Sequence, residues 1–203
     1  MKPRTVGIVD YGVGNLASLW HALHGLGFRC RVSQETSALE GTDLLLLPGV
    51  GAFPAAMEAL DQTGLAHHVR DWARRGRPVL GICLGMQLLT DSSTEHGLTH
   101  GLGLVPGSVR SLGTGRWHIG WNAIATIQDD PLFRASHGKA FYFNHSYAVQ
   151  TAPEHQVCVA SNAGKVTAVT RCGNVVGIQF HPEKSQVAGR ELLRNVVEGL
   201  CRA

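Results

Sequence analysis

The chain lacks the cysteine pattern of a disulfide framework or a zinc site. Its 203 residues include 5 cysteines, an odd number, and they are scattered along the chain without a C-x-x-C pair. Paired and regularly spaced cysteines are typical of both disulfide-rich domains and structural zinc sites. We therefore expect reduced thiols, no metal site and no cofactor.

Concentrated charge of one sign and long apolar runs are also missing. The 18 Lys and Arg nearly balance the 15 Asp and Glu, and no basic stretch interleaved with aromatic residues stands out. A nucleic-acid surface needs such a stretch, so we expect no nucleic-acid partner. No apolar run approaches the about 18 residues of a membrane span, and no secretory core is present. We expect a cytoplasmic chain without a membrane partner, folded as a single domain over residues 1–203.

Short apolar runs predict an α/β fold. Residues 6–10 and 79–82 predict strands, and the run at 44–47 is apolar without alternation, which is typical of a parallel strand that is buried on both faces. Helical patterns at 16–26, 55–60, 65–75 and 187–201 would flank them. Later runs at 108–111, 140–143, 156–162, 165–170 and 174–180 have hairpin-like spacing. We predict a three-layer, mostly parallel central sheet with flanking helices, plus antiparallel strands in the C-terminal half.

Cys83 lies where the strand at 79–82 gives way to a helix. Gly81 and Gly85 stand two residues to either side of it, which is the spacing of a nucleophile elbow, a strained turn that presents a thiol or hydroxyl at its tip. The start of a helix also favours a thiolate. A buried structural cysteine is the alternative, but it would leave the two glycines unexplained.

Two glycine-rich loops follow other strands. The stretch Pro48-Gly49-Val50-Gly51 ends the run at 44–47, and its backbone N–H groups could form an oxyanion hole at the carboxyl end of a central strand. An ordinary strand-to-helix turn is the alternative. Gly12, Gly14 and Ala17, with a later Glu35, formally match a dinucleotide fingerprint, although a tight turn against a ligand or partner explains them equally well.

A second cluster follows the strand at 174–180. His181, Pro182 and Glu183 come directly after it, and the proline fixes two titratable side chains on one turn. A cysteine nucleophile needs an imidazole to exchange its proton and an acceptor to orient that imidazole. His181 and Glu183 have the spacing for these roles, provided that the two clusters meet in space.

Seven motifs are spread along the chain. They are VDYGVGNL from Val9, PGVGAF from Pro48, GICLGMQLL from Gly81, GLGLVPG from Gly101, GWN from Gly120, HSY from His145 and FHPEKS from Phe180. These motifs resemble the class I, triad-type glutamine amidotransferases. More narrowly, the chain resembles the glutaminase subunits of imidazole glycerol phosphate synthases, and the resemblance extends over essentially its whole length. Ile119 and Asn144 depart from the usual residues of that family.

The resemblance implies roles for individual residues. Cys83 would attack the side-chain amide of glutamine, with His181 as general base and acid and Glu183 as its orienter. A separate (β/α)₈ cyclase subunit, bound as a heterodimer, would receive the ammonia and make imidazole glycerol phosphate and aminoimidazole carboxamide ribotide in histidine biosynthesis. The resemblance assigns the oxyanion hole to Val50, Gly51 and Leu84, glutamine binding to Gly49, Gln87, Glu95, Ser146 and Tyr147, and the partner interface to Asn15, Trp121, Asn122 and Lys184.

Three functions stay open at this point. The first is a glutaminase that depends on its partner. The second is a self-sufficient γ-glutamyl hydrolase, or the glutaminase of another synthase. The third is a non-catalytic, redox-sensing protein with an elbow cysteine, and it would predict oxidation of Cys83 without a glutamyl thioester.

Overall fold

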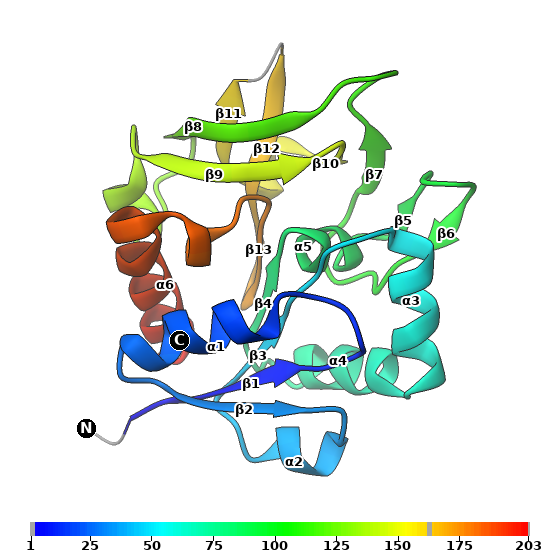
Figure 1. The fold of residues 1–203 in the computed structure, drawn as a ribbon, viewed down its shortest axis with the longest axis vertical. Helices are drawn as coiled ribbons and strands as arrows, with labels where there is room; N and C mark the ends of the chain where they lie inside the picture. The colour runs from blue at the N-terminus through cyan, green and yellow to red at the C-terminus, as the bar shows by residue number, and fades with distance from the viewer. Residues whose placement is uncertain (1–2, 162–163, 203) are drawn as a thin grey trace.

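A nine-stranded mixed sheet organises the computed structural model, which describes residues 3–161 and 164–202 (Figure 1). The strands lie in the order β2-β1-β3-β4-β13-β12-β11-β8-β9. Their bounds are β1 Thr5–Val9, β2 Arg29–Ser33, β3 Leu44–Leu47, β4 Val79–Ile82, β8 His118–Thr126, β9 Ala140–His145, β11 Gln156–Ser161, β12 Lys165–Cys172 and β13 Val175–Ile178.

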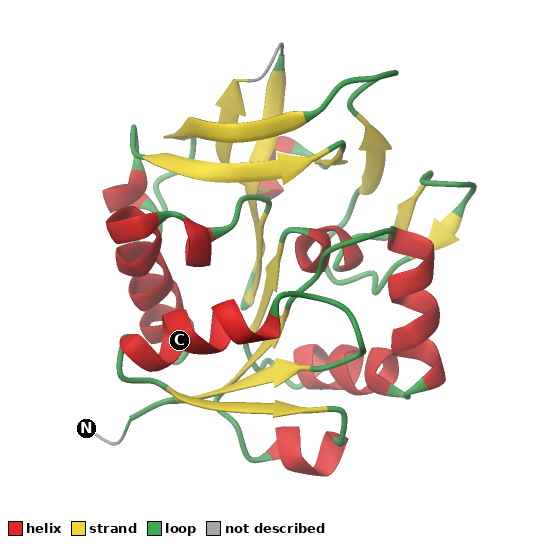
Figure 2. Cartoon of the chain, viewed as in Figure 1, coloured by secondary structure: helices red, strands yellow, loops and turns green. Residues whose placement is uncertain are grey.

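Helices flank the sheet and confirm the predicted α/β class (Figure 2). They are α1 Leu16–Gly25, α2 Thr36–Glu40, α3 Phe53–Gln62, α4 Leu65–Arg74, α5 Leu84–Leu88 and α6 Gln186–Leu200, with the 3₁₀ turns η1 Arg134–Ser136, η2 Pro153–His155 and η3 Pro182–Lys184. A smaller sheet in the order β10-β7-β5-β6 adds β10 Tyr147–Gln150, β7 Ser108–Ser111, β5 Ser92–Ser93 and β6 Thr99–His100.

The sheet is parallel only in one half, so "mostly parallel" was too strong a prediction. Strands β2, β1, β3, β4 and β13 pair in parallel, whereas β13, β12, β11, β8 and β9 pair antiparallel. The reason lies in the connections, because a short turn joins only antiparallel neighbours and a parallel pair needs a long crossover. The predicted strand 156–162 ends at Ser161, and Asn162 lies outside the described residues.

Apolar side chains cover both faces of the parallel half. In β3, Leu44 and Leu46 point into a cluster shared with α1 and α6, while Leu45 and Leu47 point into a cluster shared with α3, α4 and α5. All four are fully buried, which is why the run shows no alternation. The result is the three-layer arrangement predicted from the sequence.

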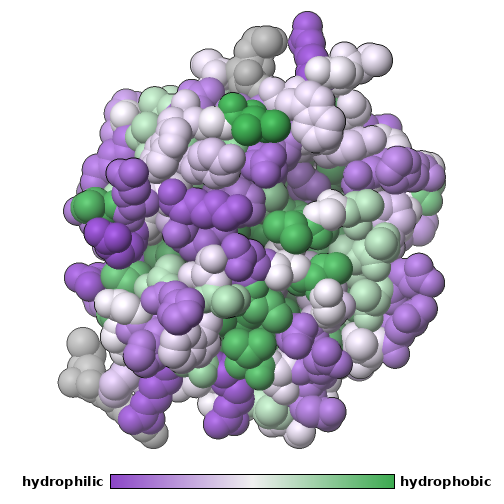
Figure 3. Space-filling view, viewed as in Figure 1, coloured by the Kyte–Doolittle hydropathy of each residue, from purple (hydrophilic) through white to green (hydrophobic). Residues whose placement is uncertain are grey.

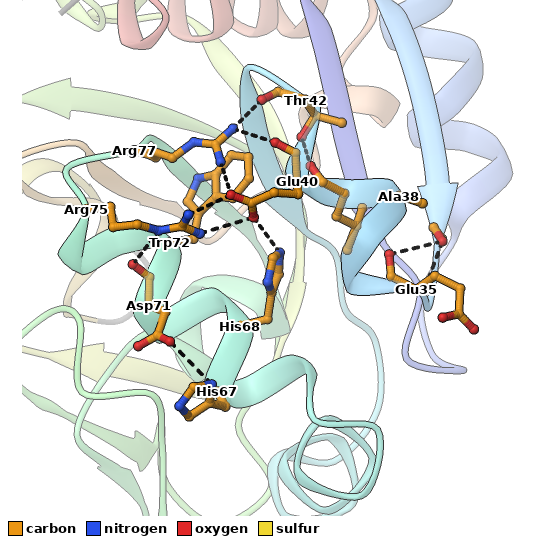
Figure 4. A network of polar contacts seen from close by, with 12 residues as sticks. Glu35, Ala38, Glu40, Thr42, His67, His68, Asp71, Trp72, Arg75 and Arg77 are labelled. Carbon is orange, nitrogen blue, oxygen red and sulfur yellow. Dashed lines mark hydrogen bonds and ion pairs between the residues drawn. The ribbon is translucent and has the colours of Figure 1, made fainter.

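Polar contacts join the end of α2, the end of α4 and the segment that leads into β4 (Figure 4). Both terminal nitrogens of the Arg75 guanidinium donate to the Glu40 carboxylate, at 2.6 and 3.1 Å. Arg77 also donates to Glu40, at 2.9 Å, and its guanidinium carbon lies 3.2 Å from the centre of the Trp72 ring. Trp72 in turn donates to the Pro78 carbonyl at 2.9 Å, one residue before β4 begins.

The surface viewed in Figure 3 carries polar residues around its rim, with several apolar residues near the middle of that face. Within the described residues, no helix has both the length and the apolar character that crossing a membrane requires.

Candidate active site

A pocket of about 330 Å³ opens where β3, β4 and β13 end and the segment after β9 passes over them. Carboxyl ends of parallel strands are where open α/β sheets bind ligands. The pocket brings together segments that are distant in sequence. Its lining consists of Val50, Gly51, Cys83, Leu84, Gln87, Glu95, Trp117, Asn144, His145, Ser146, Tyr147, His181 and Lys184.

Cys83 lies on a strained turn between β4 and α5. Its φ of 56° and ψ of −112° are rare for a residue with a side chain. The backbone holds this conformation through the Cys83 N–H, which donates to the Ile178 carbonyl of β13 at 2.7 Å. The side chain is 6 % exposed and lines the pocket, so the sulfur is shielded yet open to a ligand.

The glycines of the elbow are required by close backbone approach. A Cβ built on Gly85 would lie 1.9 Å from the Leu47 carbonyl oxygen of β3, and one on Gly81 would lie 2.6 Å from the Gly85 carbonyl oxygen. Real Cβ atoms do not approach so closely, so neither position accepts a side chain without movement of the backbone. Strands β3 and β4 and helix α5 therefore abut with no side chain between them.

His181 and Glu183 follow β13, which runs parallel to β4. His181 lines the same pocket as Cys83, and Glu183 lies behind its ring. His181 Nδ1 lies 2.8 Å from Glu183 Oε1, and the two side chains are 4 % and 2 % exposed. Burial opposes the charged form of His181, but its contacts with Cys83 and Glu183 outweigh burial and raise its pKa to about 9. The Nε2 side of the ring is left for the sulfur and a substrate.

The backbone of His181 is also held in place. Its N–H donates to the Tyr142 carbonyl of β9 at 2.8 Å, and its carbonyl accepts from the Ser185 hydroxyl at 2.6 Å. The ring is therefore positioned by contacts on both sides of the residue as well as by Glu183.

The Val50–Gly51 turn lines the pocket beside the start of α5, because the preceding Gly49 packs against Leu84 and Gly85. In the described part of the chain, the backbone N–H groups of Val50, Gly51 and Leu84 donate no hydrogen bond, which leaves them available to an oxyanion. Gly51 has a φ of 100°, a conformation that favours glycine. Tyr11 secures the turn from behind, because its hydroxyl donates to the Pro48 carbonyl.

Four of the five residues predicted to bind glutamine line the pocket, namely Gln87, Glu95, Ser146 and Tyr147. Glu95 Oε2 accepts from the N–H of Phe53, the first residue of α3, at 2.8 Å. The fifth residue, Gly49, is absent from the lining. A Cβ there would lie 2.8 Å from Leu84 Cβ and 2.8 Å from the Tyr11 hydroxyl, so Gly49 lies behind the pocket wall.

The residues predicted to meet a partner lie in different settings. Trp121 is 51 % exposed, and Asn15 and Lys184 are exposed. The Asn122 amide is instead used within the chain, because its Nδ2 donates to the Ser161 carbonyl at 2.6 Å and lies 3.2 Å from His118 Nε2.

Sequence analysis did not assign Gln179, which connects the nucleophile to the pocket wall. Its side chain is fully buried, its Oε1 accepts from Gln87 Nε2 at 3.1 Å, and its Nε2 lies 3.9 Å from the Cys83 sulfur. A signal was present, since Gln179 is the one polar side chain in the apolar run before His181 and lies two residues from it, on the same face of an extended chain. Trp117, Asn144 and His145 also line the pocket without having been assigned to it.

No group of three or more His, Cys, Asp or Glu side chains arranged to hold a metal occurs among residues 3–161 and 164–202. The free thiols in this part of the chain are Cys30, Cys83, Cys158, Cys172 and Cys201.

Comparison with known proteins gives similarity over nearly the full chain. Residues 7–199 match the family described as "Glutamine amidotransferase class-I". The imidazole glycerol phosphate synthase subunit HisH of Symbiobacterium thermophilum is 46 % identical over 198 residues, which cover 96 % of this chain and 93 % of that protein. The HisH subunit of Oceanobacillus iheyensis is 42 % identical over 95 % of this chain and 98 % of that protein.

Solved structures share the fold at much lower identity. A structure described as glutamine amidotransferase superposes with a TM-score of 0.77 and 20 % identity, covering 98 % of this chain and 99 % of that chain. A chain in the structure of PurLQS from Thermotoga maritima superposes with a TM-score of 0.76 and 21 % identity, covering 98 % and 100 %.

Proposed function

The chain belongs to the class-I glutamine amidotransferase family, and from that premise we propose that it hydrolyses glutamine through Cys83, His181 and Glu183 and supplies the ammonia to a separate (β/α)₈ cyclase subunit. It is thus a glutamine amidotransferase, and its relatives named as HisH support assignment to imidazole glycerol phosphate synthase. The observation that carries the proposal is the common pocket that Cys83 and His181 line.

The first half of the reaction forms a glutamyl thioester. The Cys83 thiol gives its proton to His181 Nε2, its sulfur attacks the carbon of the side-chain amide, and the carbonyl π electrons move to oxygen. N–H groups of Leu84 and of the Val50–Gly51 turn stabilise that negative charge. The imidazolium of His181 gives its Nε2 proton to the amide nitrogen, the C–N bond breaks, and ammonia leaves.

The second half releases glutamate. His181, now neutral, takes a proton from water, and the hydroxide adds to the thioester carbon. Collapse of the second tetrahedral intermediate breaks the C–S bond and restores the sulfur. Glu183 holds the Nδ1 proton throughout, because its Oε1 lies 2.8 Å from that nitrogen, so the ring keeps Nε2 toward the reacting atoms.

Exposed apolar side chains beside the pocket support a protein partner. Trp117, Ile119 and Trp121 stand at alternate positions in or just before β8 and are 63 %, 59 % and 51 % exposed. Alternate residues of an extended segment share a face, and Trp117 also lines the pocket. A partner on this face would lie next to the site where ammonia is released.

Replacement of Cys83 by Ala tests the proposal. We expect Cys83→Ala to abolish glutamine hydrolysis in the presence of the cyclase subunit, while synthesis from added ammonium salt continues at the wild-type rate. Persistence of glutamine turnover in the variant would contradict the assigned nucleophile. Full turnover by the wild-type chain alone would favour a self-sufficient hydrolase, and the cyclase is therefore omitted in a parallel assay.

A further inference from the structure

A row of polar side chains runs from β8 to the wall of the pocket. His145, at the end of β9, lines the pocket and is 6 % exposed. Its Nε2 lies 3.0 Å from His118 Nδ1, and His118 is 4 % exposed at the start of β8. His118 Nε2 lies 3.2 Å from Asn122 Nδ2, which also donates to the Ser161 carbonyl. The mechanism described above uses none of these side chains.

The chemistry of the partners fixes where each proton sits. His145 Nδ1 lies 2.8 Å from the Tyr147 carbonyl, which can only accept, so this nitrogen carries a proton. In the neutral ring Nε2 is then an acceptor, and His118 Nδ1 must donate to it. His118 Nε2 becomes the acceptor for the Asn122 amide, whose other hydrogen goes to Ser161. Every donor finds an acceptor in this single arrangement.

Charging His145 would break this order. A proton on its Nε2 would face the Nδ1–H of His118, and turning the His118 tautomer would bring an N–H against the amide hydrogens of Asn122. Burial acts in the same direction. Burial, helped by the neighbouring His118 and His181, outweighs the hydrogen bond to the Tyr147 carbonyl and lowers the pKa of His145 to about 4. Burial also lowers the pKa of His118.

The row ends on the backbone that forms one side of the glutamine pocket. His145 is the last residue of β9 in the large sheet, and Tyr147 is the first residue of β10 in the small sheet. The Tyr147 carbonyl accepts from both His145 Nδ1 and Gln87 Nε2, at 2.8 and 2.9 Å. The corner between the two sheets, which includes Ser146, is therefore held from two directions.

We propose that His118 and His145 are a positioning pair that fixes the Ser146–Tyr147 corner for glutamine binding. The inference rests on the proposed glutaminase function. Because the pair acts through the Tyr147 backbone, its loss weakens binding of glutamine and leaves cleavage of the bound amide nearly intact.

A kinetic comparison of variants tests this role in the full chain with its cyclase partner. His118→Leu removes the proton donor to His145. We expect KM for glutamine to rise about tenfold, which equals about 1.4 kcal/mol, while kcat stays within about twofold of wild type. In His118→Asn the side-chain Nδ2–H takes the place of the ring Nδ1–H, and KM returns to within about threefold of wild type. The matched control is His67→Leu, since His67 is 79 % exposed on α4, and both constants stay at wild-type values.

Nitrogen chemical shifts of the two rings give a readout that needs neither glutamine nor the partner. In the full chain with ¹⁵N-labelled histidine, we expect both His118 and His145 to be neutral Nδ1–H tautomers at pH 7. A histidine side chain in water favours the Nε2–H tautomer, so this pattern reports the hydrogen-bonded row. In His118→Leu the His145 signals change, and in His118→Asn they return toward those of wild type.

The outcomes separate this inference from the proposed function. An Nε2–H tautomer at either ring, or an unchanged KM in His118→Leu while wild type is active, would overturn the positioning role and leave the glutaminase assignment intact. A fall in kcat at unchanged KM would also overturn it, because the pair would then act on the chemical step. A wild-type chain that is inactive toward glutamine with its partner would instead overturn the proposed function.

Discussion

The charge of Glu183 sets the protonation of His181, and Glu183→Gln removes that charge while keeping an oxygen near the ring. The two side chains are almost fully buried, with 2.8 Å between Oε1 and Nδ1. Burial acts against a charged His181, yet Cys83 and Glu183 raise its pKa from 6.5 to about 9. An opposite charge at this range moves a pKa by about 1 to 3 units. We therefore expect the pKa of His181 to be about 1 to 3 units lower in Glu183→Gln than in wild type.

The sign of the stability effect follows from the raised pKa. A group that binds its proton more tightly when folded stabilises the protein fully below its unfolded pKa and loses that contribution as pH rises through its folded pKa. For His181 this window runs from 6.5 to about 9. At about 1.36 kcal/mol per pKa unit, the contribution lost by wild type across the window is about 3 kcal/mol.

Other effects of the substitution do not depend on pH in this window. Glu183 Oε2 is buried without a hydrogen-bond partner in the described part of the chain, and a glutamine Nε2 in its place would be an unsatisfied donor that costs about 1–3 kcal/mol. Burial raises the pKa of the thiols of Cys30, Cys158 and Cys201, so their ionisation destabilises both proteins at high pH. These thiols cancel in the difference between wild type and variant.

The assay is urea denaturation of both proteins at about pH 6, 7.5 and 9. We expect wild type to be the more stable protein at the low end, and the difference to shrink by about 1–3 kcal/mol toward the high end. NMR titration of the His181 ring provides an independent measurement of its pKa. Parallel stability curves, or an unchanged pKa in Glu183→Gln, would refute the argument that this carboxylate holds the ring charged.

Two further substitutions test the support behind the pocket. Gly85→Ala places a Cβ 1.9 Å from the Leu47 oxygen, and we expect a loss of about 1–3 kcal/mol or more in thermal unfolding, together with loss of Cys83 alkylation by a glutamine analogue. Gly25→Ala is the control, because nothing lies within 4 Å of that Cβ and Gly25 is the last residue of α1, so its stability is expected to stay within about 0.5 kcal/mol of wild type. Tyr11→Phe leaves the Pro48 carbonyl without its donor. We expect a stability loss of about 1–3 kcal/mol in urea and a lower kcat, whereas unchanged values would mean that this contact does not hold the turn.

The parallel half of the fold could be predicted because its signal is local. Residues 44–47 and 79–82 are apolar at every position since both faces are buried, and the glycines around Cys83 reflect close contacts made within a few residues of the elbow. Strand β8 was not predicted. It mixes exposed Ile119 and Trp121 with buried His118, so neither a continuous run nor polar and apolar alternation marks it. Helix α2 spans only Thr36–Glu40, which is too short to reveal helical periodicity.

The residues of the site divide in the same way, into those that a local motif marks and those that depend on contacts between distant segments. Short motifs bring Gln87 to the pocket, close to the elbow, and bring Glu183 to the His181 ring that lines the pocket. The contact of His118 with His145 joins two strands across 27 residues of sequence. Nothing in either local sequence encodes a partner so far along the chain. Gly49 is not part of the pocket lining because Leu84 and Tyr11 pack against it, and the local sequence does not show this packing either.

The contact of Gly85 with the Leu47 carbonyl makes the sulfur and the oxyanion donors parts of one inflexible block. A mutation that moved the Cys83 sulfur would also move the oxyanion donors. Stepwise mutation of this region therefore has few ways to change substrate preference without loss of activity. The Ser146–Tyr147 corner enters the pocket from different strands, β9 and β10, and the Tyr147 carbonyl meets α5 through the hydrogen bond from Gln87. Laboratory evolution toward amides other than glutamine should therefore gather its successful changes at that corner and leave the elbow untouched.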